Sequence, residues 1–118
     1  MTTKSESEKT AIFITKRGMG TAAEELSMLL LKNYLTLLKS ENLVPSYICL
    51  YAEGVHCASE GSSVTEELAA LEAAGARVIS CKTCLNYYGL AEKLKAGSAG
   101  TMLDIIEIQS MCKKHINL

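Results

Sequence analysis

The sequence lacks a long apolar run, an apolar leader and an excess of either charge. No apolar run approaches the ~18 residues needed to span a membrane. The first nine residues are polar and charged, unlike the apolar core of a signal peptide. The 12 Lys and Arg residues nearly balance the 13 Asp and Glu residues, so no net positive field attracts nucleic acid. We therefore expect a cytoplasmic protein with neither a membrane nor a nucleic-acid partner.

The sequence also lacks the motifs of the common hydrolytic and phosphate-binding enzymes. It has no serine triad pattern, no paired-carboxylate motif and no phosphate-binding lysine loop. Cysteine, by contrast, occurs five times, at Cys49, Cys57, Cys81, Cys84 and Cys112. An odd number in such a chain argues against a disulfide framework and for reduced thiols. Cys49 and Cys112 fall in apolar patterns and are expected in the core, which leaves Cys81 and Cys84 available for chemistry.

Apolar segments of two different periods alternate along the chain. Strand-type runs at residues 11–14, 47–51 and 76–81 alternate with helical patterns at 21–39, 63–74 and 85–95, the last interrupted near Gly89. A final helix is expected over 101–113, with a very short strand within 97–100 and an edge strand over 115–118. This alternation predicts a three-layer α/β fold, a flavodoxin-like or doubly wound, mostly parallel sheet of about five strands with helices on both faces. We expect a disordered lead over residues 1–9 and a single domain over residues 10–118.

Shorter patterns predict the helix ends and the apolar helix faces. Thr21 with Glu24, and Ser63 with Glu66, match the capping box that begins a helix, and Gly75 is placed to end the second helix. The apolar face of the first helix is predicted from Leu26, Leu30, Tyr34 and Leu37. That of the last helix is predicted from Met102, Ile105, Ile106 and Cys112.

The most informative pattern is the Cys-x-x-Cys unit of Cys81 and Cys84, which directly follows the third expected strand. Ligands of open parallel sheets collect at the carboxyl ends of strands, and a following helix N-terminus favours a thiolate. Such a pair is a redox or sulfur-transfer couple, half of a zinc site, or two small apolar residues filling the core. All three interpretations stay open from spacing alone.

His56 and Cys57 follow the second expected strand and reach the same sheet edge as Cys81 and Cys84. Their shared position at this edge would allow a zinc site built from these four residues. Neighbouring residues such as His56 and Cys57 rarely aim at one ion, however, and structural zinc sites pair two short ligand units. We therefore predict neither a metal nor another cofactor. His115 is expected at the surface or on the edge strand.

A glycine loop follows the first expected strand and opens the first helix. Gly18 and Gly20, followed by Ala23, formally match the dinucleotide fingerprint G-x-G-x-x-G/A. Lys16 and Arg17 would lie near bound phosphates, while Glu53 lies further along the chain than the usual ribose-binding acid. A small nucleotide or anion bound by a loop of Gly18, Gly20 and Gly54 is one hypothesis. A glycine turn that serves helix–strand packing is the simpler interpretation.

The segment from Cys81 to Leu90 resembles the Cys-Gly-Thr-Cys-Leu segment of DsrE/DsrF-like proteins. It is most similar to the DsrE-like C-terminal domain of YedF-type proteins, which are associated with selenium metabolism. The resemblance covers nearly everything beyond Thr10, with Lys82 in place of the usual glycine. Supporting positions are Gly18 and Gly20 with residues 24–26, then residues 53–55 and 60–62, and Met102.

The resemblance implies a sulfur relay, in which relatives pass sulfur between proteins as a cysteine persulfide. It implies Cys81 as the sulfur acceptor, from its spacing to Gly89, and Cys84 as the assisting or resolving thiol. The TusA-like sulfur-carrier domain that precedes this domain in YedF-type proteins has no counterpart in this sequence. We therefore expect a TusA-like or other persulfide donor to act in trans, and we expect a homo-oligomer. The resemblance leaves open whether the cargo is sulfur or selenium, and whether the chain is instead a non-catalytic subunit of a relay complex.

Three residues near the cysteine pair have two interpretations each. Lys82 either lowers a thiol pKa or is an ordinary solvated lysine. Tyr87 and Tyr88 either line a pocket mouth or an oligomer contact, or pack as ordinary amphipathic aromatics.

Overall fold

A computed structural model of the chain describes residues 9–118 and contains one five-stranded parallel sheet. The strand order is β4-β3-β2-β1-β5, and each neighbouring pair is parallel. The strands are β1 (Thr10–Ile14), β2 (Tyr47–Leu50), β3 (Arg77–Cys81), β4 (Ser98–Gly100) and β5 (Lys114–Asn117). The predicted α/β fold is confirmed, although this order differs from the 2-1-3-4-5 order of flavodoxin itself. The predicted disordered lead lies outside the described residues except for Lys9, whose carbonyl accepts a hydrogen bond from the Lys114 N–H.

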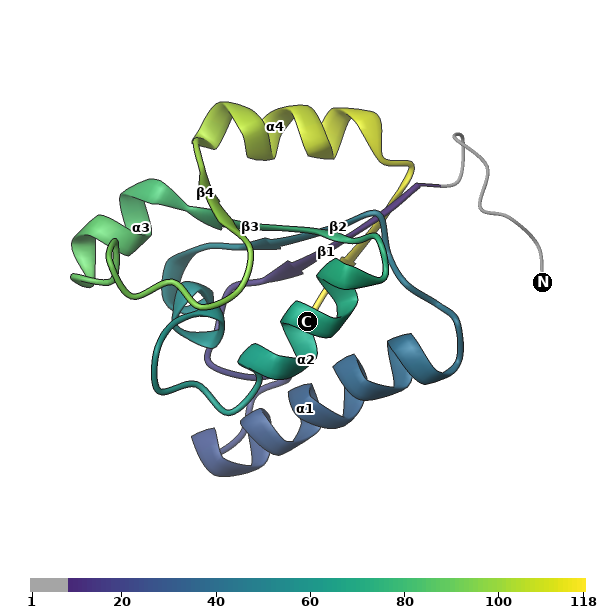
Figure 1. Cartoon of the computed structure of the whole chain (residues 1–118), viewed down its shortest axis with the longest axis horizontal. Helices are drawn as coiled ribbons and strands as arrows, with labels where there is room; N and C mark the ends of the chain where they lie inside the picture. Colours follow the sequence, from purple (N-terminus) through teal and green to yellow (C-terminus); the bar gives the residue numbers. More distant parts are fainter. Residues whose placement is uncertain (1–8) are drawn as a thin grey trace.

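Helices cover both faces of the sheet, as Figure 1 shows. Two helices, α1 and α2, lie on one side, and α4 lies on the other. The helical segments are α1 (Glu24–Ser40), the 3₁₀ helix η2 (Ala52–Ala58), α2 (Thr65–Ala73), α3 (Lys82–Tyr87) and α4 (Met102–Met111). The inner strands are buried because helices pack against both faces of the sheet. The sequences of β1 and β2 are therefore continuous apolar runs. Within residues 9–118 no helix is long and apolar enough to cross a membrane.

The two predicted capping boxes are wrong, and a third is present elsewhere. Helices α1 and α2 begin after Ala23 and Val64, neither of which makes a side-chain cap bond. The Ser62 hydroxyl accepts from the Val64 N–H instead, which forms a turn ahead of α2. The capping box belongs to Thr101 and Asp104 at the start of α4. Gly75 does follow α2 with a left-handed φ of 119°, as predicted.

The buried face of α1 is rotated from the predicted one. Ser27, Leu31 and Leu35 are buried, whereas Leu26, Leu30 and Leu37 are exposed. The prediction failed because leucines occupy positions on both sides of this helix, so apolar spacing alone does not identify the inward side. In α4 the prediction is partly right, since Ile105 and Cys112 are buried but Met102 and Ile106 are exposed.

The segment after β3 differs from the expected helix over 85–95. Helix α3 starts earlier, at Lys82, and ends by Gly89, which takes a left-handed φ of 70°. Residues 90–97 then form turns and a single bridge between Leu94 and Ser59. The short strand within 97–100 and the edge strand near the C-terminus are confirmed as β4 and β5.

All carboxyl ends of the strands lie at one edge of the sheet because every pair is parallel. The segments that leave this edge are the β1–α1 loop, η2, α3 and the start of α4. Gly54 brings η2 against β1, where an added Cβ would overlap the Ile14 carbonyl oxygen. The close approach places η2 next to α3 and the cysteine pair.

Candidate functional site

The two motif cysteines occupy the junction between β3 and α3. Cys81 is the last residue of β3 and the N-cap of α3, with extended backbone angles. Cys81 is 1% exposed, whereas Cys84, in the first turn of α3, is partly exposed. Both thiols are free. The strand and helix therefore bring the pair together, with one thiol inside the molecule and the other facing its surface.

A backbone N–H from the neighbouring loop points at the outer thiol. The Ala52 N–H donates to Cys84 Sγ over 3.1 Å. Ala52 begins η2 and holds a left-handed φ of 52°, an uncommon conformation for a residue with a Cβ. Such backbone strain often marks functional sites. An N–H donor favours a sulfur anion over the neutral thiol, so this contact is suited to a thiolate or persulfide anion.

Burial nevertheless raises the pKa of the Cys84 thiol above its usual value. The Ala52 N–H lowers this pKa, and the hydrogen bond and charge of the neighbouring Cys81 thiol raise it. Burial outweighs the Ala52 contact, so Cys84 is mainly a protonated thiol at neutral pH. Lys82 is exposed at the start of α3. A nucleophilic reaction of Cys84 would then depend on its small thiolate fraction or on a change in its surroundings.

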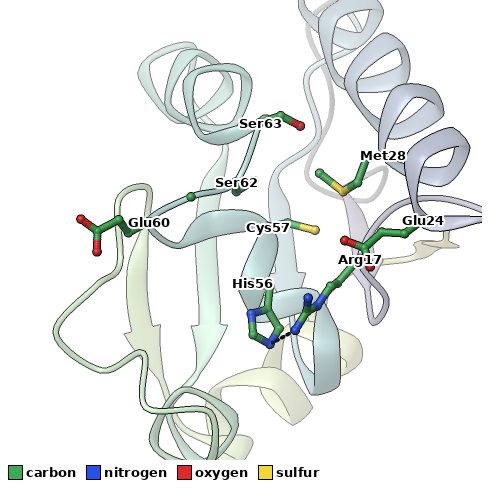
Figure 2. Close-up of a pocket in the computed structure, with 9 residues that line it drawn as sticks. Arg17, Glu24, Met28, His56, Cys57, Glu60, Ser62 and Ser63 are labelled. Atoms are coloured by element: carbon green, nitrogen blue, oxygen red, sulfur yellow. Dashed lines mark hydrogen bonds between the residues drawn. The ribbon is translucent and has the colours of Figure 1, made fainter.

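Cys57 and His56, the two remaining candidates, lie on η2 beside a cavity (Figure 2). Cys57 is buried and donates to the Lys16 carbonyl over 3.5 Å, and burial raises its pKa to about 11. Within the described part of the chain, no three His, Cys, Asp or Glu side chains are arranged to bind a metal ion. Cys49 and Cys112 are buried in the core as predicted.

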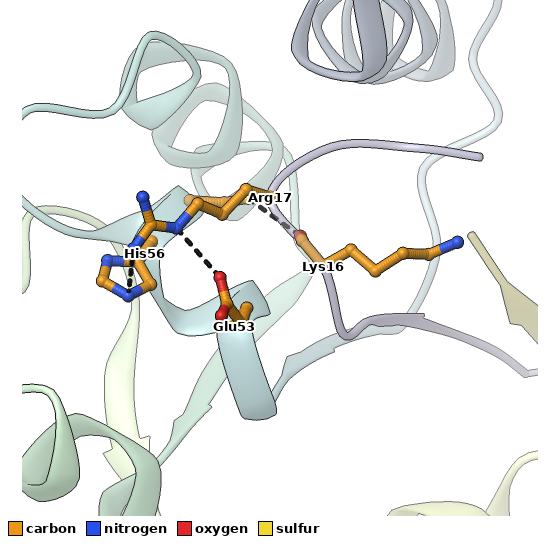
Figure 3. A network of polar contacts seen from close by, with 5 residues as sticks. Lys16, Arg17, Glu53 and His56 are labelled. Carbon is orange, nitrogen blue, oxygen red and sulfur yellow. Dashed lines mark hydrogen bonds and ion pairs between the residues drawn. The ribbon is translucent and has the colours of Figure 1, made fainter. Parts of the chain in front are cut away.

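A polar cluster that the sequence analysis did not anticipate joins η2 to the β1–α1 loop. Figure 3 shows Arg17 lying between His56 and Glu53. Arg17 Nη2 donates to His56 Nε2 over 2.9 Å, and Arg17 Nε lies 3.1 Å from Glu53 Oε1. A guanidinium has only donors, so His56 Nε2 must be the unprotonated acceptor and Nδ1 carries the proton. Burial and then Arg17 lower the His56 pKa, while Glu53 and Glu24 raise it.

Aromatic rings connect this cluster to the cysteine pair. The Tyr88 ring lies 4.6 Å from the His56 ring, and the Tyr87 ring meets Tyr88 edge-on at 5.0 Å. Burial raises the pKa of Tyr88, and the charges of Glu53, Tyr87 and Cys84 raise it further. Tyr88 therefore packs beside the site, whereas Tyr87 is 81% exposed. The C-terminal end of α3 therefore contacts His56 of η2 through the Tyr88 ring.

The glycine loop lies at the same edge but is shaped by packing. An added Cβ at Gly18 would lie 2.5 Å from the Ser27 backbone of α1, and one at Gly54 would overlap the end of β1. Gly20 has open space around it and a left-handed φ of 77°. The hollow beside the loop has a volume of about 320 Å³, and its charged lining residues are two cations and two anions, Lys16, Arg17, Glu24 and Glu53. Lys16 Nζ already donates to the Gly20 carbonyl over 3.2 Å, so the loop offers an anion no concentrated positive charge.

A family profile that spans nearly the whole chain identifies its class. The DsrE/DsrF-like family profile matches residues 4–118, and the chain belongs to this family. Membership supports a role related to sulfur relay. No curated protein sequence matches the chain.

Solved structures share the fold over nearly the whole chain. The ychN protein from E. coli aligns with a TM-score of 0.68 at 18% identity, covering 94% of this chain and 99% of that one. Protein MTH1491 of Methanobacterium thermoautotrophicum, described as of unknown function, aligns with a TM-score of 0.70 at 17% identity, over 94% and 99% of the two chains. BT1422 of Bacteroides thetaiotaomicron, also of unknown function, gives 0.67 at 15% identity, over 93% and 95%. At these identities the likeness concerns the fold.

Proposed function

We propose that this protein is a sulfur-relay protein that carries sulfur, or selenium, as a persulfide on the Cys81 and Cys84 pair. The observation that carries the proposal is the partly exposed Cys84 thiol, which accepts a hydrogen bond from the Ala52 N–H and neighbours the buried Cys81 thiol. Membership of the DsrE/DsrF-like family supports the same chemistry. The resemblance to the C-terminal domain of YedF-type proteins, carried by the segment from Cys81 to Leu90, is part of this proposal.

Burial favours Cys84 as the acceptor, which reverses the roles expected from the resemblance. A protein-borne persulfide must bring its outer sulfur into contact with the attacking thiolate. Cys81 is 1% exposed and would need a movement of α3 to make this contact, whereas Cys84 already faces the surface. The Ala52 N–H also points at Cys84 rather than Cys81. Cys81 then lies behind Cys84 as the assisting thiol.

The proposed transfer balances without an added oxidant. The Cys84 thiolate attacks the outer sulfur of a donor persulfide R–S–SH, forming a Cys84 persulfide and releasing the donor as a thiolate. An acceptor thiolate then attacks the outer sulfur in the same way and restores the Cys84 thiolate. In the alternative branch, the Cys81 thiolate attacks Cys84 Sγ and releases hydrosulfide, leaving a Cys81–Cys84 disulfide. A dithiol reductant must then reduce that disulfide.

The proposed donor is a TusA-like or other persulfide-bearing protein that acts in trans. The exposed Tyr87 side chain lies one turn from Cys84 on α3, where a docking protein would meet it. Aromatic side chains are enriched at protein interfaces. This supports α3 as the surface that the donor approaches.

We also propose that the protein forms a homo-oligomer. Helix α1 exposes four leucines, and Leu29 among them is 54% exposed. Helix α4 exposes its own apolar residues on the other face of the sheet. Contiguous apolar surface on a small domain marks an interaction site. The exposed apolar residues of these two helices are Leu26, Leu29, Leu30, Leu37, Met102, Leu103, Ile106 and Met111.

The relay function is tested by intact-mass analysis after exposure to a persulfide donor under non-reducing conditions. The wild type and a Cys112→Ser variant, which alters a buried core cysteine, are expected to gain one sulfur atom. A Cys81→Ser/Cys84→Ser variant is expected to gain none. Equal loading of the double variant would contradict the proposal. Absence of loading in the wild type would favour a non-catalytic subunit of a relay complex.

A further inference from the structure

A second hollow lies at the carboxyl ends of β1 and β2, outside the cysteine pair. Its volume is about 290 Å³, and it is enclosed by η2, the loop after it, the β1–α1 loop and the first turns of α1. Neither Cys81 nor Cys84 lines it. Ligand pockets generally span about 300–1,000 Å³, so this volume is at the small end of the range and has room for a molecule of amino-acid size. The position is one where α/β folds commonly bind small molecules.

Opposite charges line the same side of this cavity. Figure 2 shows Arg17 and Glu24 on the same side of the cavity, while Glu60, its other acidic lining residue, lies on the opposite side. Arg17 Nη2 forms a hydrogen bond with His56 and Nε forms an ion pair with Glu53, while neither Nε nor Nη1 makes a hydrogen bond within residues 9–118. Glu24, in the first turn of α1, lines the cavity from an exposed position, so its carboxylate is accessible to a ligand that enters from solvent. A neighbouring cation and anion match the carboxylate and ammonium of an α-amino acid, which are joined to one carbon atom.

Two sulfur atoms face the interior. Met28 of α1 and Cys57 of η2 both line the cavity, and Figure 2 shows their sulfur atoms directed into the space between the two helices. Cys57 donates to the Lys16 carbonyl and, with a pKa of about 11, stays a neutral thiol at physiological pH. A thioether and a neutral thiol form a soft, polarisable surface. Such a surface suits a ligand whose side chain contains sulfur.

We propose that this cavity binds a small α-amino acid with a sulfur-bearing side chain, of which cysteine and its persulfide are the simplest. The ligand carboxylate pairs with Arg17 Nη1, its ammonium with Glu24, and its sulfur lies against Met28 and Cys57. The inference goes beyond the relay function, because binding here requires neither Cys81 nor Cys84. His56 lines the cavity and contacts Tyr88, so the bound ligand would lie close to the relay site.

Calorimetric titration of the reduced protein with L-cysteine tests this proposal. The matched ligands are L-2-aminobutyrate, in which a methyl replaces the thiol, and 3-mercaptopropionate, which lacks the ammonium. L-Cysteine is expected to bind the wild type and the Cys81→Ser/Cys84→Ser variant equally, and to bind more tightly than either matched ligand. Absence of L-cysteine binding to the wild type, or equal binding of L-2-aminobutyrate, overturns the proposal. The Cys81→Ser/Cys84→Ser variant cannot be loaded with a persulfide, so L-cysteine binding to this variant tests the cavity independently of the relay function.

The variants Glu24→Gln and Glu25→Gln localise the binding. Glu25 is the next residue of α1, is exposed and does not line the cavity. Glu24→Gln is expected to weaken L-cysteine binding by at least about tenfold, as for loss of one charged hydrogen bond, and Glu25→Gln to leave it unchanged. Equal affinities of the two variants overturn the site. Met28→Leu provides a second test at similar side-chain volume, and it should weaken binding of L-cysteine but not of L-2-aminobutyrate.

Discussion

The contact between Gly54 and the end of β1 gives a sharp prediction for the substitution Gly54→Ala. An added Cβ would overlap the Ile14 carbonyl oxygen and lie 2.6 Å from its carbon and 3.1 Å from Thr15 Cα. These are backbone atoms, so no side-chain rotation relieves the overlap. The Ile14 oxygen also accepts the Tyr51 N–H over 3.1 Å, which limits its own movement. Segment η2 must therefore move away from β1.

The expected loss of stability is about 3 kcal/mol. Overpacking typically costs ~1–3 kcal/mol, and loss of the Tyr51 hydrogen bond adds ~1 kcal/mol. For a domain of this size each kcal/mol lowers Tm by ~4 °C, so a fall of ~12 °C is expected. The movement also withdraws the Ala52 N–H from Cys84 Sγ, which raises the Cys84 pKa further and slows its alkylation.

Urea unfolding and alkylation of Cys84, followed by mass spectrometry, measure the two effects of Gly54→Ala. The control is Gly20→Ala, because an added Cβ there meets no atom within 4 Å and only the left-handed φ of 77° is strained. That strain costs ~1–2 kcal/mol and leaves Cys84 alkylation unchanged. A Gly54→Ala protein with the stability of Gly20→Ala and unchanged alkylation would refute the packing role of Gly54 and its link to the site.

Three further predictions concern the thiols and the assembly. Alkylation of Cys84 should speed up about tenfold per pH unit up to pH 9, because its pKa is raised, and a rate that levels off by pH 7 would contradict this. A Cys81→Ala variant should be alkylated faster at pH 8, because the Cys81 thiol raises the Cys84 pKa, and an unchanged rate would contradict that contribution. The folded-state pKa of Cys57, about 11, exceeds that of a free thiol, so its contribution to stability is complete below pH ~8.5 and is lost as pH rises towards 11. The urea midpoint should therefore fall less over this pH range in Cys57→Ala than in the wild type, and an equal fall in the two proteins would contradict the raised Cys57 pKa. Leu29→Glu should reduce the mass measured by light scattering to that of a smaller assembly, whereas Lys39→Glu near the other end of α1 should not; an unchanged mass in both would remove α1 from the interface.

The sheet was predictable from sequence, but the inward side of its helices was not. Buried parallel strands such as β1 and β2 have short, continuous apolar sequences, and their alternation with longer helical patterns indicates a parallel sheet. In α1 the three consecutive residues Leu29, Leu30 and Leu31 face different directions, and only the last is buried. The direction that faces the sheet depends on tertiary packing, which a single sequence does not report.

The site was predictable in part for a related reason. Cys81 and Cys84 could be placed at the sheet edge because a strand pattern precedes them directly. The Arg17–His56 contact could not be foreseen, because it joins the β1–α1 loop to η2 and its two residues lie 39 positions apart. The Ala52 contact comes from a backbone N–H, which every residue except proline has, so no residue type signals it. Its left-handed φ is equally invisible in an alanine.

The most direct test of the proposed relay is to locate the persulfide in the single variants Cys81→Ser and Cys84→Ser. Each is exposed to the same persulfide donor, and the loaded residue is identified by peptide mass mapping without reduction. Because Cys84 is the accessible thiol and Cys81 is buried, we expect Cys81→Ser to carry one added sulfur atom on Cys84, and Cys84→Ser to carry none. Loading of Cys81 in the Cys84→Ser protein, with none on Cys84 in the Cys81→Ser protein, would contradict this account and make the buried thiol the acceptor.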